Sequence, residues 1–181
     1  QYRVEELASP AAFSKNPDLV WEWYSWRRSL IRNIEPNPGH YAVAQMEKLF
    51  PQFLLATQNV DGLHHLAGNE KVVELHGNIF HERCTVCSFR RRSRDLYDNP
   101  PKCPDCGAIL RPDIIWFGES LSRIALEKCW EFANESDCII VIGTSGVVFP
   151  AAQLPLIVRE CGGKIIEVNP NRTPLSPMAD I

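Results

Sequence analysis

The chain has 181 residues, a formal net charge of −3 and a sequence pI of about 6.0. This length suits one ordinary domain plus a small module. A folded chain of this length buries about two-thirds of the surface that its unfolded form exposes, so it does not need disulfide bonds for stability. The acidic balance argues against bulk binding to nucleic acid or anionic membrane, and no apolar stretch reaches the ~18 residues of a membrane span. Four of the seven cysteines lie in two C-x-x-C pairs. This usage favours a reducing compartment and a metal site, so we expect a cytoplasmic protein.

The first fifty residues read as helical. Ser9-Pro10, Asn16-Pro17 and Asn37-Pro38 each place a helix-capping residue before a proline. We predict one helix over about residues 17–31 and another that begins at residues 37–38. The apolar positions of the second helix should face the core: Ala42, Val43, Met46, Leu49 and Phe50. The turn residues before this helix favour a structural role for His40.

Helical periodicity predicts an apolar stripe on the 17–31 helix, made by Leu19, Val20, Trp23, Trp26, Leu30 and Ile31. Arg27 falls inside this stripe and Tyr24 lies at its edge. A guanidinium on a buried face needs an acidic or equivalent partner. Arg27 therefore either snorkels or pairs with an internal acid, or it joins Tyr24 in a clamp for an acidic group of a substrate.

Two short apolar runs end abruptly in polar residues. The run 53–57 leads into Gln58-Asn59-Val60-Asp61, and the run 72–75 leads into His76-Gly77. In open α/β sheets, ligands bind at the carboxyl ends of such buried strands. Asn59 and Asp61 either point to one side together or form an Asx turn that caps a short helix. His76 is either a hydrogen-bonded core histidine or a general base, because imidazole titrates near neutrality.

The clearest single motif is metal-binding. Cys84-x2-Cys87 is separated by fifteen residues from Cys103-x2-Cys106. Four thiolates make a closed tetrahedral site, so we predict one structural Zn²⁺ per chain in preference to two redox-active pairs. The basic run 90–94 between the pairs is either a solvated hairpin or a surface that contacts nucleic acid.

The last third of the chain predicts a βαβ unit. A helix over 122–135 precedes a buried parallel strand, Cys138 to Ile142, which ends in Gly143-Thr144-Ser145. A helix over about 150–161 and a strand over 164–168 follow, and the strand ends in Asn169. We expect three buried thiols, those of Cys129, Cys138 and Cys161. The segment after the cysteine module, Ile115-Trp116-Phe117-Gly118-Glu119, is either a buried strand or an exposed edge to which a peptide can add.

Five strings, taken in this order, resemble the sirtuins, which are NAD-dependent protein deacylases: 57–61, 74–77, the two cysteine pairs, 115–119 and 143–145. The resemblance implies an α/β fold, a Rossmann-like parallel sheet with an inserted zinc-ribbon module. It implies an NAD-binding domain formed by residues 1–79 and 113–181, with a helical segment at 9–50, and a zinc module at 80–112.

The resemblance also implies the chemistry: removal of acyl groups from protein lysines, with nicotinamide, O-acyl-ADP-ribose and free lysine as products. His76 would be the general base. Residues that would bind NAD are Gln58, Asn59, Val60 and Asp61 at the nicotinamide end and Gly143, Thr144, Ser145 and Asn169 at the adenosine end. The acyl-lysine protein or peptide would lie along Ile115, Trp116, Phe117, Gly118 and Glu119. The Tyr24–Arg27 pair is similar to the one that marks the subgroup acting on succinyl- and malonyl-lysine.

Two parts expected of the family are missing from this sequence: a glycine-rich segment near its start, and a final strand and helix after Asp180. A sirtuin carries Gly-Ala-Gly-x-Ser after its first strand, whereas the first glycine here is Gly39. Those glycines let backbone amides bind the pyrophosphate. We therefore expect a piece of a longer, active protein, with no turnover by residues 1–181 alone. The rival functions are a non-catalytic zinc ribbon that binds nucleic acid through residues 90–94, and an ADP-ribosyltransferase. We expect no membrane or nucleic-acid partner, and the sequence does not determine the oligomeric state.

Overall fold

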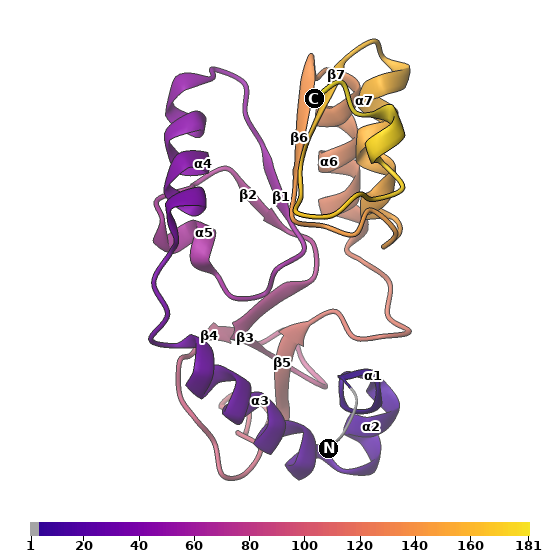
Figure 1. Ribbon diagram of the computed structural model, residues 1–181. Helices are drawn as coiled ribbons and strands as arrows, with labels where there is room; N and C mark the ends of the chain where they lie inside the picture. Colours follow the sequence, from indigo (N-terminus) through magenta and orange to yellow (C-terminus); the bar gives the residue numbers. More distant parts are fainter. Residues whose placement is uncertain (1–3) are drawn as a thin grey trace. The chain divides into compact units, whose positions relative to one another are not determined.

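The computed structural model describes residues 4–181 (Figure 1). Contacts divide the chain into two compact units, which join between Leu121 and Ser122. Each unit is an α/β arrangement of its own, with one pair of parallel strands. The domain limits drawn from the resemblance, 1–79 with 113–181 and 80–112, stay a prediction.

The helices of the first unit are α1 (Val4–Leu7), α2 (Pro10–Lys15), α3 (Pro17–Ile31), α4 (Pro38–Leu49) and α5 (Leu63–Leu66). The predicted caps are confirmed: Ser9 Oγ, Asn16 Oδ1 and Asn37 Oδ1 accept backbone N–H bonds of 3.1–3.2 Å. The Asn37 N–H lies 3.2 Å from His40 Nδ1 and completes a capping box. The structural role predicted for His40 is therefore confirmed.

The predicted apolar face of α3 is only partly right: Val20 is buried and Trp23 and Ile31 pack against the core, but Trp26 and Leu30 do not. Val20, Trp21, Tyr24 and Arg28 are buried, whereas the Trp26 and Leu30 side chains are 56% and 54% exposed. Trp21 can be buried because its Nε1–H donates to the Leu110 carbonyl over 2.8 Å.

The predicted core face of α4 is also only partly right. Val43 and Ala44 are buried, but Leu49 and Phe50 are 75% and 51% exposed. In both helices the packing partner selects the buried face, and hydropathy alone did not identify it.

Five strands form two sheets in the first unit. β1 (Leu55–Thr57) pairs in parallel with β2 (Val72–Glu74), so that Thr57 lies opposite Glu74. β3 (Gly77–Cys84), β4 (Arg90–Arg92) and β5 (Leu110–Ile114) form an antiparallel sheet in the order β4-β3-β5. Helix α3 lies along this sheet (Figure 1). Residues of α2, α3, the sheet and the segments next to them share one apolar and aromatic core: Ala8, Phe13, Val20, Trp21, Tyr24, Ile79, Phe80, Ile114 and Trp116.

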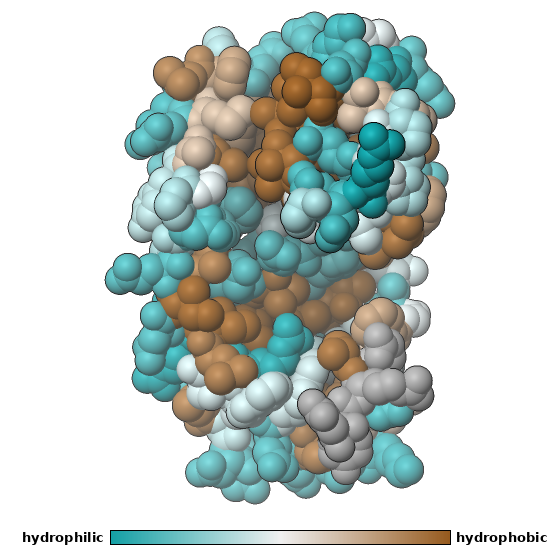
Figure 2. Space-filling view, viewed as in Figure 1, coloured by the Kyte–Doolittle hydropathy of each residue, from teal (hydrophilic) through white to brown (hydrophobic). Residues whose placement is uncertain are grey.

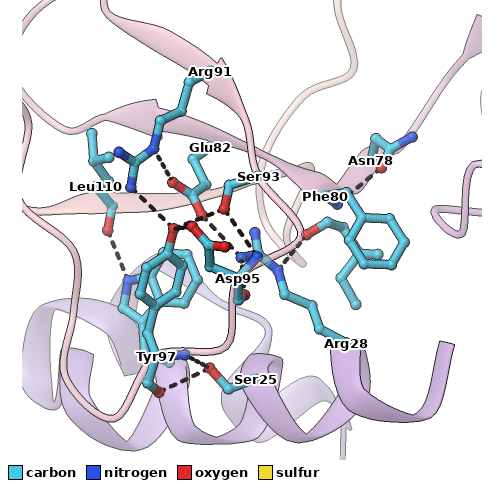
Figure 3. A network of polar contacts seen from close by, with 12 residues as sticks. Ser25, Arg28, Asn78, Phe80, Glu82, Arg91, Ser93, Asp95, Tyr97 and Leu110 are labelled. Atoms are coloured by element: carbon cyan, nitrogen blue, oxygen red, sulfur yellow. Dashed lines mark hydrogen bonds and ion pairs between the residues drawn. The ribbon is translucent and has the colours of Figure 1, made fainter. Parts of the chain in front are cut away.

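A buried ion pair ties α3 to the antiparallel sheet (Figure 3). Arg28 and Glu82 are both 0% exposed, and Arg28 Nη1 donates to Glu82 Oε1 over 2.9 Å. Arg28 Nε donates to the Ile79 carbonyl (2.8 Å), and Arg91 Nε donates to the second Glu82 oxygen (2.6 Å). The buried guanidinium therefore has the internal acid that the sequence argument required, but the arginine is Arg28, next to the predicted Arg27.

The second unit contains α6 (Arg123–Asn134), β6 (Cys138–Ile142), the 3₁₀ helix η1 (Ala151–Gln153), α7 (Leu154–Glu160), β7 (Lys164–Val168) and the 3₁₀ helix η2 (Ser176–Met178). β6 and β7 are parallel and pair from Cys138–Lys164 to Ile142–Val168, so the predicted βαβ unit is confirmed.

The predicted burial of β6 is wrong, since Cys138 and Ile142 are exposed and the residues between them are half-buried. Among the described residues β6 pairs only with β7. Of the three predicted buried thiols, only Cys129 is buried, while Cys138 and Cys161 are exposed.

The surface is mainly hydrophilic on the face shown in Figure 2, where apolar residues form separate patches. Within residues 4–181, no helix has the length and hydropathy needed to cross a bilayer.

Candidate functional site

The four predicted zinc ligands come together. The sulfurs of Cys84, Cys87, Cys103 and Cys106 all lie within 4.8 Å of one another. The Cys84–Cys106 and Cys87–Cys103 sulfurs are 3.4 and 3.6 Å apart. Tetrahedral Zn–S bonds of about 2.3 Å place the sulfurs about 3.8 Å apart, so this cluster fits one Zn²⁺ with no open position. The site is structural, as predicted.

Backbone N–H groups stabilise the thiolate form of one of these cysteines. The N–H groups of Cys87 and Val86 point at Cys84 Sγ, at 3.4 and 3.3 Å. These contacts lower the pKa of the Cys84 thiol to about 6. A thiolate is the form that binds zinc, and backbone donors stabilise it before the metal arrives.

His76 lies in the turn between β2 and β3, and the turn requires the glycine that follows. Gly77 has φ +79°, and a Cβ at that position would lie 2.1 Å from the Asp113 carbonyl oxygen. His76 Nδ1 lies 3.0 Å from the Gln58 carbonyl oxygen. Because a carbonyl only accepts, Nδ1 must carry the hydrogen, and the neutral ring keeps its lone pair on Nε2. This is the arrangement of an oriented general base.

The 58–62 loop, from Gln58 to Gly62, lies directly against that turn. The Ile79 N–H donates to the Val60 carbonyl over 2.8 Å, next to the His76–Gln58 contact. Asp61 Oδ1 accepts from the Leu63 N–H (2.9 Å), so one of its oxygens forms the expected Asx turn at the start of α5. The structure thus brings Gln58, Val60 and Asp61 into one loop beside His76.

Asn59 is exposed in the same loop, and its N–H donates to Thr57 Oγ1 over 3.1 Å. This contact fixes the backbone at the start of the loop.

Residues 115–119 are not a strand, because β5 ends at Ile114. The Ile115 N–H donates to the His76 carbonyl (3.0 Å), and the Phe117 N–H donates to the Ala8 carbonyl (2.9 Å). Phe117 is 56% exposed, whereas Trp116 is buried. The backbone N–H groups of Ile115 and Phe117 are therefore already bonded within the protein.

Glu119 holds the far end of this segment. Its carboxylate accepts from Arg111 Nη1 and Nη2 (2.6 and 2.9 Å) and from the Trp116 N–H (2.8 Å). Burial alone would raise the pKa of Glu119, but these donors outweigh it and hold the pKa below its usual value.

Tyr24 and Arg27 are adjacent on α3 but differ in environment. Tyr24 is 0% exposed, and its hydroxyl accepts from Trp116 Nε1 over 2.8 Å. Burial raises the pKa of Tyr24 to about 12. Arg27 is half-buried, with its guanidinium carbon 4.9 Å from the centre of the Trp23 ring. A clamp would therefore present Arg27 more readily than Tyr24.

The predicted adenosine contacts gather in the second unit, at the carboxyl ends of β6 and β7. Asn169 Nδ2 donates to the Thr144 carbonyl over 2.8 Å, and the Gly143 N–H donates to the Val168 carbonyl over 2.9 Å. Ser145 is exposed in the same loop. Two neighbouring strand ends thus present polar groups at one edge, as ligand sites of parallel sheets do.

The basic run is largely paired within the protein. Arg90 pairs with Asp113, Arg91 pairs with Glu82, and Arg94 Nη2 donates to the Arg32 carbonyl. These contacts favour the solvated hairpin over a surface for nucleic acid.

Sequence reasoning missed the Arg28–Glu82 pair. The available signal was the spacing of Trp21, Tyr24 and Arg28, three and four residues apart, which marks one helical face.

The fold and the site define an α/β protein with polar strand ends and a four-cysteine zinc module. The chain belongs to the Sir2 family, whose family model matches residues 1–150.

Its curated relatives include an NAD-dependent protein deacylase of Aquifex aeolicus, 52% identical over 183 residues. The alignment covers 100% of this chain and 77% of the relative. An NAD-dependent protein deacylase of Thermococcus kodakarensis is 51% identical over 192 residues, covering 99% of this chain and 73% of that protein.

Solved structures agree with this assignment. A Sir2 homologue in complex with NAD matches with a TM-score of 0.95 at 48% identity, covering 99% of this chain and 71% of that one. Sir2Tm bound to a propionylated peptide matches with a TM-score of 0.90 at 32% identity, covering 99% and 78%.

Proposed function

We propose that this protein is an NAD-dependent protein-lysine deacylase with His76 as its general base. The observation that carries the proposal is the contact of His76 Nδ1 with the Gln58 carbonyl, beside the loop that holds Asn59 and Asp61. Similar proteins are named NAD-dependent protein deacylases, and related Sir2 structures contain NAD or a propionylated peptide. The products are nicotinamide, O-acyl-ADP-ribose and free lysine.

The chain's residues divide the work between binding and proton transfer. NAD, when bound, supplies the ribose carbon that accepts the acyl oxygen, with nicotinamide as the leaving group. Asn59 and Asp61 offer both a donor and an acceptor, which is what recognition of a carboxamide and a ribose requires. His76 Nε2 takes the proton of a ribose hydroxyl.

The polar residues at the ends of β6 and β7 serve the adenosine end of NAD, in this proposal. Thr144, Ser145 and Asn169 offer hydroxyls and an amide there, and Gly143 lets the backbone turn away from β6. The 115–119 segment binds the acyl-lysine peptide, with Phe117 as its exposed side chain.

The defining test is mass spectrometry of acetyl-, succinyl- and malonyl-lysine peptides incubated with NAD and the full-length protein. His76→Ala should lower turnover by about 10²- to 10⁴-fold, the usual share of a general base. His81→Ala, in β3, is the matched control and should turn over like the wild type. ADP-ribose attached to the protein, without loss of the acyl group, would indicate an ADP-ribosyltransferase.

For the acyl group we propose a preference for succinyl and malonyl over acetyl. The support is Arg27, a half-buried guanidinium three residues from Tyr24 on one helix. A guanidinium can hold a carboxylate with two parallel hydrogen bonds. Arg27→Met should reduce desuccinylation far more than deacetylation, while Arg32→Met, at the exposed end of α3, should change neither. Equal losses of desuccinylation and deacetylation activity in Arg27→Met would refute the proposed clamp.

We also propose a cytoplasmic location, because two C-x-x-C pairs that form a metal site are typical of a reducing compartment. Fractionation of cells that express the protein would test this.

A further inference from the structure

The turn that carries His76 is closed by a hydrogen bond between two other side chains. Asn78 Nδ2 donates to Glu74 Oε1 over 2.6 Å, so the five residues from Glu74 to Asn78, here called the His76 turn, form a loop with joined ends. Asn78 is 5% exposed and the Glu74 side chain 14%. A hydrogen bond to a charged, largely buried acceptor is worth more than an ordinary one.

The other end of the Asn78 amide is also engaged. Its Oδ1 accepts from the Phe80 N–H over 2.9 Å (Figure 3), which orients the amide and leaves Nδ2 directed at Glu74. Glu74 itself lies at the end of β2, opposite Thr57 of β1. The bond therefore fastens the start of β3 to the end of β2, across the histidine.

Asn78 also supports the 58–62 loop. Gly62 has φ +73°, and a Cβ there would lie 3.0 Å from Asn78 Nδ2. The Ile79 N–H bonds the Val60 carbonyl one residue further on. The amide of Asn78 thus lies where the His76 turn meets the loop proposed to bind nicotinamide ribose.

We infer that Glu74 and Asn78 are positioning residues, whose hydrogen bond sets the place of the His76 imidazole relative to the 58–62 loop. This inference rests on the proposed function of His76. Proton transfer needs donor and acceptor at hydrogen-bond distance, and a displacement of about 1 Å can cost about 10²-fold in rate. Neither residue need touch the substrate to have this effect.

The test exchanges the two ends of the bond. Asn78→Asp keeps the acceptor for the Phe80 N–H but sets a carboxylate against Glu74. Glu74→Gln keeps an acceptor for Asn78. The double variant restores the bond, because the new glutamine donates to the new aspartate, with the same total charge as the wild type.

In the full-length protein we expect Asn78→Asp to lower kcat by about 10- to 100-fold, with KM for NAD and peptide changed by less than about threefold. Glu74→Gln alone, and the double variant, should stay within about fivefold of wild-type kcat. Asn99→Asp makes the same substitution at an exposed site and should have no effect. If Asn78→Asp does not fold, as judged by circular dichroism, Glu74→Ala replaces it and should show the same loss of kcat.

The outcomes separate two claims. A wild type without NAD-dependent deacylation, or a fully active His76→Ala, defeats the proposed function. The positioning role alone is overturned if the wild type is active and His76→Ala is inactive, but the folded Asn78→Asp or Glu74→Ala protein has the kcat of the wild type. A loss in Asn78→Asp that Glu74→Gln does not reverse also overturns it, because it would then reflect general damage to the fold.

Discussion

Replacing Glu82 by glutamine tests whether the buried ion pair holds α3 to the antiparallel sheet. The substitution keeps the shape of the side chain and one oxygen acceptor, but it removes the charge opposite Arg28 and Arg91. Arg28 would then be a cation with no exposure and no carboxylate beside it. One of its nitrogens, Nη2, is already buried without a hydrogen-bond partner among the residues that the structure describes.

The cost follows from burial. Removing one partner of a buried pair typically destabilises by about 3–5 kcal/mol, because the remaining charge is left uncompensated. For a chain of this size, each kcal/mol lowers Tm by about 2–4 °C, so we expect a fall of roughly 6–20 °C. A surface pair offers the comparison: Glu127 pairs with Arg123 on α6 at side-chain exposures of 43% and 89%. Such pairs contribute about 0–1 kcal/mol.

The assay is thermal and urea unfolding, followed by circular dichroism, of the wild type, Glu82→Gln and Glu127→Gln. The double variant Arg28→Met with Glu82→Leu should recover most of the loss, since apolar residues of similar volume can replace a buried pair. A loss below about 1 kcal/mol in Glu82→Gln, or one no larger than in Glu127→Gln, would refute the reasoning.

Three further results are expected. A strong chelator should release about one zinc per chain and lower Tm. Cys106→Ser should lose the metal, whereas the exposed Cys161→Ser should keep it. Equal zinc content in the two variants would contradict the four-cysteine site. Gly62→Ala should destabilise by about 1–2 kcal/mol and slow deacylation, because its φ of +73° strains any side chain; wild-type melting and turnover would argue against that strain. Because burial raises the pKa of Tyr24 to about 12, above its unfolded value of about 10, its contribution to stability should be complete below pH 10 and lost as the pH rises towards 12. In urea unfolding, the free energy of unfolding of Tyr24→Phe should fall less than that of the wild type over this pH range, and the exposed Tyr41→Phe should behave like the wild type. The same dependence of the unfolding free energy on pH in all three proteins would rule the effect out.

Local chemistry was enough to predict much of this protein. The 17–31 helix begins where its cap and proline predict, because a capping side chain bonds a backbone N–H only three residues away. The cysteine spacing identified all four zinc ligands, since each knuckle is built from neighbouring residues. The order of the strings indicated the family, and the family comparison confirmed it.

Only the tertiary structure decided which polar groups could be buried. Periodicity placed Arg27 inside, yet the buried arginine of α3 is Arg28, because Glu82 and the Ile79 carbonyl bind it from 54 and 51 positions away in the chain. The same holds for β6, which reads as a core strand but pairs only with β7 among the described residues. Sequence determines what each segment can form by itself. Which face is buried depends on hydrogen-bond and packing partners that are distant in the chain, and their positions are known only once the chain has folded.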